Sequence, residues 1–313
     1  MSILILGASC IDIIGQSDKR IISYESNPGI VKILQSGSAR NTAEYLSRIG
    51  ILSNLVTAVG QDVFGQNLLT GLAQLGIDIS QSLILKSVST STNMYLTDAD
   101  GELFAGVKSD NISYMLDIGY LRNVIKNSPN ILMADDTLNI ETILYISGNV
   151  KADLKIFQPL NLKINPDIIS VINKFDVIKL NKSQAETLWG GLISSSDDAK
   201  RCARYLSDSK KIKKVFITLD DLGSVGADIN GTVHIPAYKT ERSNKTEAES
   251  AFSAGMIFSL ANDFSLYRSV LFSQSCYSYA NNLLPGSRDK FSLEEVWNML
   301  LRGDKIILQS EEY

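Results

Sequence analysis

The chain has 313 residues, of which 44% are hydrophobic and 20% are charged, and its formal net charge is −4. This length predicts one large α/β domain or two smaller ones, and the charge gives no basis for binding nucleic acid or an anionic membrane. The three widely spaced cysteines make neither a disulfide framework nor a zinc site, which favours the cytoplasm. We expect neither a signal segment nor a membrane span, because no apolar run is long enough.

The first elements predict a ligand-binding edge. Ile3 to Ala8 is a short apolar run that ends in small residues, which is typical of a strand buried in a parallel sheet. Asp12 follows where open α/β sheets bind ligands, although a turn-capping role explains it equally well. Ser36 to Asn41 opens the first clear helix, and Asn41 either reaches a ligand above that turn or bonds locally.

Two stretches predict a small separate sheet. Residues 13–34 lack a helical period, and residues 90–108 alternate between apolar and polar side chains around an Asp100-Gly101 turn. We expect these two insertions to form a lid over the ligand edge. Asp110, just beyond the second insertion, is a candidate ligand contact.

The rest of the chain alternates strands with helices, which implies a parallel, doubly wound sheet within a single domain of residues 1–313. The expected strands are 55–60, 131–134, 155–158, 177–180 and 214–219, and the expected helices are 62–76, 140–148, 166–173, 184–189 and 197–207. The only histidine, His234, lies in a strand-like stretch. This argues against histidine-based metal sites and serine–histidine triads.

The stretch from Ser243 to Gly255 predicts a tight turn that opens a buried helix. Unpaired N–H groups and a partial positive charge make a helix N-terminus a natural anion site. Glu247 and Glu249, however, stand where a phosphate cradle requires glycine. By itself, the stretch is either no phosphate site or one that has lost its function.

The order of these motifs resembles that of the PfkB-type, ribokinase-like sugar and nucleoside kinases, over nearly the whole chain. The resemblance rests on G-A-S-C-I-D (7–12), S-G-S-A-R-N (36–41), V-G-Q-D-V-F-G-Q (59–66), D-V-I-K-L-N-K-S-Q-A-E (176–186), F-I-T-L-D-D-L-G-S (216–224) and A-F-S-A-G (251–255). Within that family, A-R-N (39–41), D-D-T-L-N-I-E-T (135–142) and N-K-T (244–246) look most like pseudouridine kinases.

The resemblance implies a doubly wound, mostly parallel sheet with helices on both faces and a small β-sheet lid. It implies transfer of a phosphoryl group from MgATP to a primary hydroxyl, a reaction that depends on positioning and electrostatic stabilisation. The family's sugar-binding residues correspond to Asp12, Gly37 and Asn41, which are kept. A homodimer formed through the lid is also expected.

The nucleotide side departs from the family pattern. The N-x-x-E motif corresponds to Asn181 to Gln184, so the magnesium-associated acid is a neutral amide here. The T-x-G-x-x-G motif corresponds to Thr218 to Gly223, with Asp220 in place of a glycine. The G-A-G-D turn corresponds to Glu247-Ala248-Glu249-Ser250, so both glycines and the catalytic aspartate are absent.

These departures predict a nucleoside- or sugar-binding protein with weak or no phosphotransfer and no bound MgATP. Ser250 stays protonated near neutral pH, and losing a positioned base costs roughly 10²–10⁴ in rate. Glu247 and Glu249 would also set negative charge against a triphosphate. The alternative is an active kinase with a rearranged site, in which Glu249 is the base and Asp220 or Asp221 holds the metal. A purely structural dimer partner would need no pocket, and the retained Asp12 argues against it.

Overall fold

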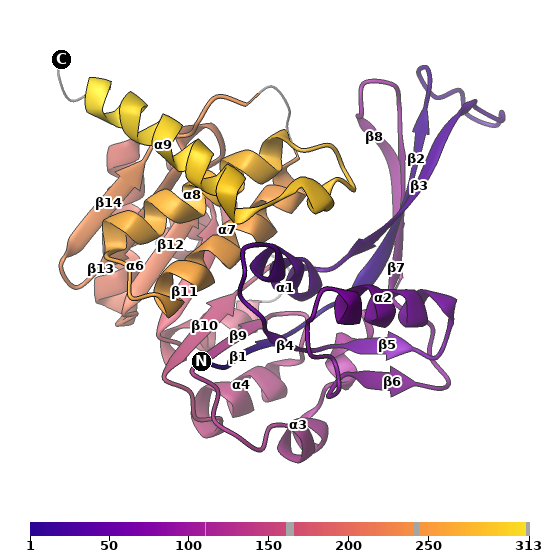
Figure 1. Ribbon diagram of the computed structural model, residues 1–313, viewed down its shortest axis with the longest axis horizontal. Helices are drawn as coiled ribbons and strands as arrows, with labels where there is room; N and C mark the ends of the chain where they lie inside the picture. Colours follow the sequence, from indigo (N-terminus) through magenta and orange to yellow (C-terminus); the bar gives the residue numbers. More distant parts are fainter. Residues whose placement is uncertain (110, 161–165, 241–243, 311–313) are drawn as a thin grey trace.

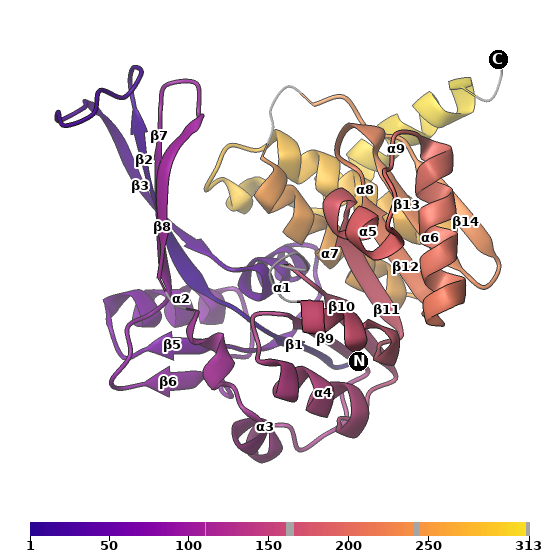
Figure 2. The same cartoon turned by 180° about the vertical axis from the view of Figure 1, so that it is seen from behind.

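The computed structural model describes the backbone of residues 1–109, 111–160, 166–240 and 244–310. A central sheet carries helices on both faces, and a smaller sheet stands to one side of it (Figures 1 and 2). The central sheet has the order β14 (Gly231–Ile235), β13 (Ser224–Asp228), β12 (Lys214–Thr218), β11 (Val177–Asn181), β10 (Leu154–Gln158), β9 (Ile131–Asp135), β1 (Ile3–Leu6) and β4 (Asn54–Val56). This is the ribokinase-like α/β fold that the resemblance implied.

Strand direction in the central sheet locates the ligand edge. All neighbours from β12 to β4 are parallel, whereas β13 and β14 form an antiparallel hairpin that the sequence did not predict. From β1 the chain goes first to β4 on one side and then to β9 on the other. The strand order therefore reverses at β1, and open sheets of this kind bind ligands beyond the carboxyl ends of the strands at such a reversal.

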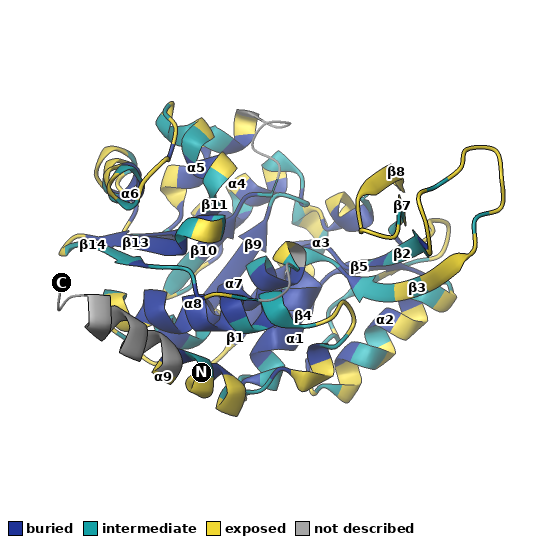
Figure 3. Ribbon diagram, turned by 90° about the horizontal axis from the view of Figure 1, so that it is seen from above, coloured by how far each residue is buried: buried dark blue, intermediate teal, exposed yellow. Residues whose placement is uncertain are grey.

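Two groups of helices cover the two faces of the central sheet (Figure 3). One face carries α3 (Ile118–Val124), α4 (Ile140–Asn149), α5 (Lys182–Trp189) and α6 (Ser196–Lys210), and the other carries α1 (Ser38–Arg48), α7 (Lys245–Ala261), α8 (Leu266–Asn282) and α9 (Leu293–Ser310). The helix expected at 166–173 is instead a pair of short 3₁₀ helices, Pro166–Ser170 and Ile172–Lys174. Among the described residues, no helix is long and apolar enough to cross a bilayer.

The expected strand 55–60 divides into two elements. Its first half is β4 in the central sheet, and its second half is β5 (Ala58–Gly60), which pairs with β6 (Leu83–Leu85) beside α2 (Val63–Gln74). The lid sheet consists of β3 (Gly29–Ser36), β2 (Cys10–Ser17), β7 (Thr92–Thr97) and β8 (Leu103–Lys108), in that order. Its strands come from both stretches that the sequence assigned to a lid.

Register divides the lid sheet into two unlike faces. Asp12, Asn93 and Lys108 lie opposite one another on one face. That face is turned toward the body of the molecule, because a Cβ on Gly286 would lie 3.1 Å from the Leu34 side chain, and Leu34 is opposite Asp12. The outer face carries exposed apolar side chains: Val31, Ile33, Met94, Leu96 and Val107.

Candidate functional site

The carboxyl ends of four parallel strands bring polar side chains to one edge of the central sheet. Asp135 ends β9, Gln158 ends β10, Asn181 ends β11 and Thr218 ends β12. The sequence had predicted only the last two as site residues. The first turns of α1 and α7 lie at this edge, because Gln158 contacts Ser38 at 3.4 Å and Thr218 contacts Glu249 at 2.8 Å.

The sugar side of the site is held by pairing within the lid sheet. Asp12 lies on β2, and the Asn93 side chain on β7 donates a hydrogen bond of 2.7 Å to its Oδ1. The strand register sets Asn93 opposite Asp12, so this contact fixes the carboxylate on the face turned toward the body. Asn93 was not found by sequence reasoning. Asp110, the other expected lid contact, lies outside the described residues.

Gly37 and Asn41 shape the start of α1. Gly37 has φ +112°, and a Cβ there would lie 2.4 Å from the Ala8 carbonyl oxygen, so only glycine lets this turn approach the end of β1. Asn41 is buried, and its Oδ1 accepts a hydrogen bond of 3.2 Å from Arg40 Nη1. The sequence left a ligand contact and a local bond open for Asn41, and the structure contains a local bond.

The start of α7 differs from the expected turn. The helix begins at Lys245, so Glu247 to Ser250 all have helical geometry, and the Ala248 N–H donates to the Asn244 carbonyl oxygen at 3.0 Å. The prediction of a tight turn here was therefore wrong. Glutamate favours a helix over a turn by roughly 0.5–1 kcal/mol per residue relative to glycine, which accounts for helical geometry at Glu247 and Glu249.

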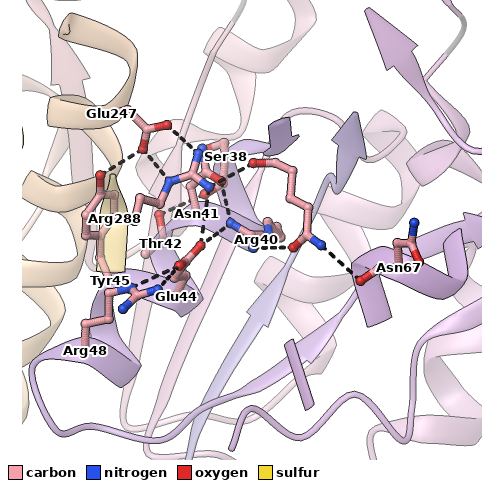
Figure 4. Close-up of polar contacts among 11 residues, drawn as sticks. Ser38, Arg40, Asn41, Thr42, Glu44, Tyr45, Arg48, Asn67, Glu247 and Arg288 are labelled. Carbon is pink, nitrogen blue, oxygen red and sulfur yellow. Dashed lines mark hydrogen bonds and ion pairs between the residues drawn. The ribbon is translucent and has the colours of Figure 1, made fainter. Parts of the chain in front are cut away.

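Glu247 is neutralised by the chain itself (Figure 4). Its carboxylate forms a two-point ion pair with Arg288, with Nε at 2.6 Å from Oε2, and accepts a hydrogen bond of 2.8 Å from the Tyr45 hydroxyl. Arg288 also lies 3.3 Å from Glu44, which pairs with Arg40 and Arg48 on α1. Burial opposes the charge of Arg288, but these carboxylates outweigh it and raise the pKa of the guanidinium.

The charge of Glu247 therefore cannot act as the free repulsive charge that the sequence suggested. The cluster that holds it contains three guanidinium groups and two carboxylates: Arg40, Arg48, Arg288, Glu44 and Glu247. All but Arg48 are buried, with Arg48 partly exposed. This cluster connects α1, α7 and the segment after α8.

Glu249, like Glu247, has a buried basic partner, which is Lys179 on β11. The two side chains form an ion pair, and the Thr218 hydroxyl donates a hydrogen bond of 2.8 Å to Glu249 Oε1. Burial lowers the pKa of Lys179 to about 7, and its Nζ lies 5.8 Å from the centre of the Phe252 ring. A carboxylate of the chain thus lies at the carboxyl ends of β11 and β12. Sequence reasoning missed Lys179.

Gln184 has a structural role at the beginning of α5. Asn181 accepts a hydrogen bond of 2.9 Å from the Gln184 N–H, and Gln184 Oε1 accepts one of 2.8 Å from the Asn181 N–H. The amide nitrogen of Gln184 donates to the Pro159 carbonyl oxygen at 2.7 Å. This is a capping box, and a neutral amide satisfies it without any metal. Over the described residues, no group of three potential metal-ligating side chains occurs.

The loop after β12 contains two residues with positive φ, only one of which is a glycine. Asp220 has φ +52° and Gly223 has φ +91°. A Cβ on Gly223 would lie 2.1 Å from the Ile235 carbonyl oxygen, so glycine is required there. Asp220 tolerates the left-handed region better than most residues, at a cost of about 1 kcal/mol, and its Oδ1 pairs with Lys245 Nζ at 2.9 Å.

Comparison with known proteins identifies the family of this chain. The family model for pfkB family carbohydrate kinases matches residues 1–279. The chain belongs to this family. The pseudouridine kinase of Escherichia coli is 29% identical over 282 residues, which cover 89% of this pfkB-family chain and 90% of that enzyme.

Solved structures agree on the pfkB-family fold. A Clostridium perfringens protein assigned to the sugar kinases aligns with a TM-score of 0.83 and 26% identity over 96% of both chains. Ribokinase of Thermotoga maritima aligns with a TM-score of 0.80 and 20% identity, covering 96% of this chain and 99% of that one. At 20% identity, the comparison with ribokinase shows a shared fold only.

Proposed function

We propose that this pfkB-family chain binds a nucleoside or a sugar beneath the lid sheet and transfers phosphate poorly or not at all. The observation that carries the proposal is the start of α7 at Lys245. Because residues 247–250 are already helical, the Ala248 N–H is bonded to the Asn244 carbonyl oxygen and is not free to hold a developing phosphoryl charge at the position of the family's glycine turn. Ser250 follows in the same helix and supplies no base at neutral pH.

The side chains at this edge do not match the needs of MgATP. Lys179, a buried cation at this edge, already pairs with Glu249, so its charge is not available to a triphosphate. Gln184 offers no carboxylate for magnesium. Lys245, at the start of α7, pairs with Asp220, so its charge too is partly matched by the chain itself.

The likeness to pseudouridine kinase makes pseudouridine the first ligand to test. Asp12, held by Asn93, offers a carboxylate to sugar hydroxyl groups on the inner face of the lid sheet. We further propose a homodimer through the outer face of that sheet, where the apolar side chains are exposed. The free cysteines and the negative net charge support a cytoplasmic location.

Titration of the purified protein with MgATP tests the proposal. We expect no detectable binding to the wild type and no turnover of pseudouridine. The double variant Glu249→Gly, Ser250→Asp should gain MgATP binding, because Lys179 loses its internal anion and a base is restored. Adding Lys179→Met to that variant should remove the gain.

Micromolar MgATP binding with ordinary turnover by the wild type would overturn the proposal. The variant Glu249→Gln then tests the rearranged kinase. Loss of turnover with retained MgATP binding would assign the base role to Glu249, and unchanged turnover would assign it elsewhere.

A further inference from the structure

The inner face of the lid sheet carries a second row of side chains beside the row that contains Asp12. Each member of this second row lies two residues from a member of the first, and side chains at that spacing share a face of a sheet. The second row consists of Ile14, Tyr95 and Gly106, which the strand register sets opposite one another. The two rows are roughly 7 Å apart along the strands.

The Tyr95 ring occupies the space of the missing side chain at Gly106. A Cβ on Gly106 would lie 3.1 Å from Tyr95 Cδ1 and 3.5 Å from its Cε1. Glycine weakens the interior of a strand, and it often marks a position where a ligand or another group approaches the backbone closely. At this position, glycine allows the aromatic ring to lie across β8.

Tyr95 is half-buried and lies near the Asp12 carboxylate. Burial, and after it the charges of Asp12 and Cys10, raise the pKa of the Tyr95 hydroxyl. This hydroxyl is therefore protonated at neutral pH and can donate a hydrogen bond. Ile14, opposite the ring, is also half-buried. The second row thus offers a partly exposed aromatic and apolar surface next to the carboxylate that the proposed function assigns to the sugar.

A free sugar and a nucleoside would use these two rows differently. A ribose bound at Asp12 fits against the first row and leaves the second row uncovered. A nucleoside reaches both rows, because a planar base projects from its ribose. Stacking of a base on an aromatic side chain stabilises binding and tolerates different bases, since every base has a π-face.

We propose that the lid sheet selects nucleosides over free sugars, with the ribose at Asp12 and the planar base against the Tyr95 ring. The inference rests on the proposed function, from which it takes the sugar site at Asp12. It adds Tyr95 as the residue that determines the ligand class. A ring that only covers Gly106 would support the edge strand β8, and its loss would change stability without changing this selectivity.

Calorimetric titration of the full chain with pseudouridine and with ribose tests the inference. We expect the wild type to bind pseudouridine at least about tenfold more tightly than ribose. Tyr95→Ala should weaken pseudouridine binding about tenfold and leave ribose binding unchanged, whereas Tyr95→Phe should keep most of the preference. Tyr205→Ala, at an exposed tyrosine on α6, is the control and should change neither affinity.

The variant Gly106→Val tests the position of the ring without altering Tyr95 itself. The added side chain takes the space that the ring occupies, so the ring must move. We expect Gly106→Val to lose the preference for pseudouridine as Tyr95→Ala does. The double variant Gly106→Val, Tyr95→Ala should lose no more than either single variant, because both remove the same contact. Thermal unfolding of each variant identifies a folding defect.

Three results would overturn the inference. Equal affinities of the wild type for pseudouridine and ribose, or a pseudouridine affinity that Tyr95→Ala leaves unchanged, would do so while the proposed function stands. A parallel loss of both affinities in a folded Tyr95→Ala variant would assign the ring a structural role instead. If the wild type binds neither pseudouridine nor ribose, the sugar site of the proposed function fails together with the inference.

Discussion

Two glutamates in the first turns of α7 each have a basic partner from a distant part of the chain. Glu247 pairs with Arg288, and Glu249 pairs with Lys179. An unpaired charge at such depth would cost several kcal/mol, so each pair makes its glutamate tolerable. At the scale of single residues, both glutamates are therefore integrated parts of the fold.

The variant Asp12→Ala should weaken pseudouridine binding about tenfold or more, because it removes the carboxylate that Asn93 holds on the inner face of the lid sheet. Asp12→Asn should retain part of the affinity. Calorimetry with pseudouridine measures both, and Asp18→Ala, an exposed acid just beyond the same strand, serves as the control. Unchanged affinity in Asp12→Ala would disprove the sugar side of the proposal.

The carboxyl group of Asp135 should make stability depend on pH. Burial raises its pKa from 3.8 to about 7, and its Oδ2 has no hydrogen-bond partner. The folded state therefore keeps a proton that the unfolded chain releases, so this contribution is full below pH 4 and is lost as pH rises through 7. The loss is at most roughly 4 kcal/mol.

Asp135→Asn should remove most of that pH dependence. Urea unfolding of the wild type and the variant at pH 5 and pH 8 measures it. We expect the difference between the two pH values to be smaller in the variant. Equal differences in both proteins would mean that Asp135 is ionised in the folded state at both pH values.

At the scale of elements, the cluster around Glu247 connects α1, α7 and the segment after α8. Arg288→Met should destabilise the fold by about 3–5 kcal/mol, since it leaves a buried carboxylate without its cation. The double variant Arg288→Met, Glu247→Met should recover much of that loss. Urea unfolding of the single and double variants measures the coupling, and purely additive losses would contradict it.

The start of α7 also explains where sequence reasoning failed. The resemblance suggested a turn at Glu247 to Ser250, but glutamate and alanine at these positions favour a helix. Strands such as 131–134 and helices such as 140–148 were predicted well, because hydrophobic periodicity is a local signal. The helix expected at 166–173 is two 3₁₀ turns, which share the apolar spacing over so short a stretch.

Sequence reasoning missed several site residues for a common reason, which is that their partners lie far away in the chain. Lys179 contacts Glu249 across 70 positions, Arg288 contacts Glu247 across 41, and Asn93 contacts Asp12 across 81. No local pattern connects such partners. Motifs identified the strand ends at Asn181 and Thr218, but only the packing of α7 on the sheet revealed what their neighbours bind.

At the scale of the whole molecule, the outer face of the lid sheet should mediate dimerisation. An apolar surface exposed on a two-faced sheet is typical of an interaction site. The variant Val31→Lys, Val107→Lys should shift the protein toward a monomer in light scattering after gel filtration. Leu192→Lys, an equally exposed apolar position in the body, should leave the mass unchanged. A wild-type monomer would contradict the proposed dimer.

The ion pair between Lys179 and Glu249 couples two positions that lie 70 residues apart in the chain. A change of Glu249 alone leaves a buried ammonium group without its partner, at a cost in stability. A change of Lys179 alone isolates the carboxylate instead. A joint change avoids both unpaired states, so we expect these two positions to vary together rather than one at a time.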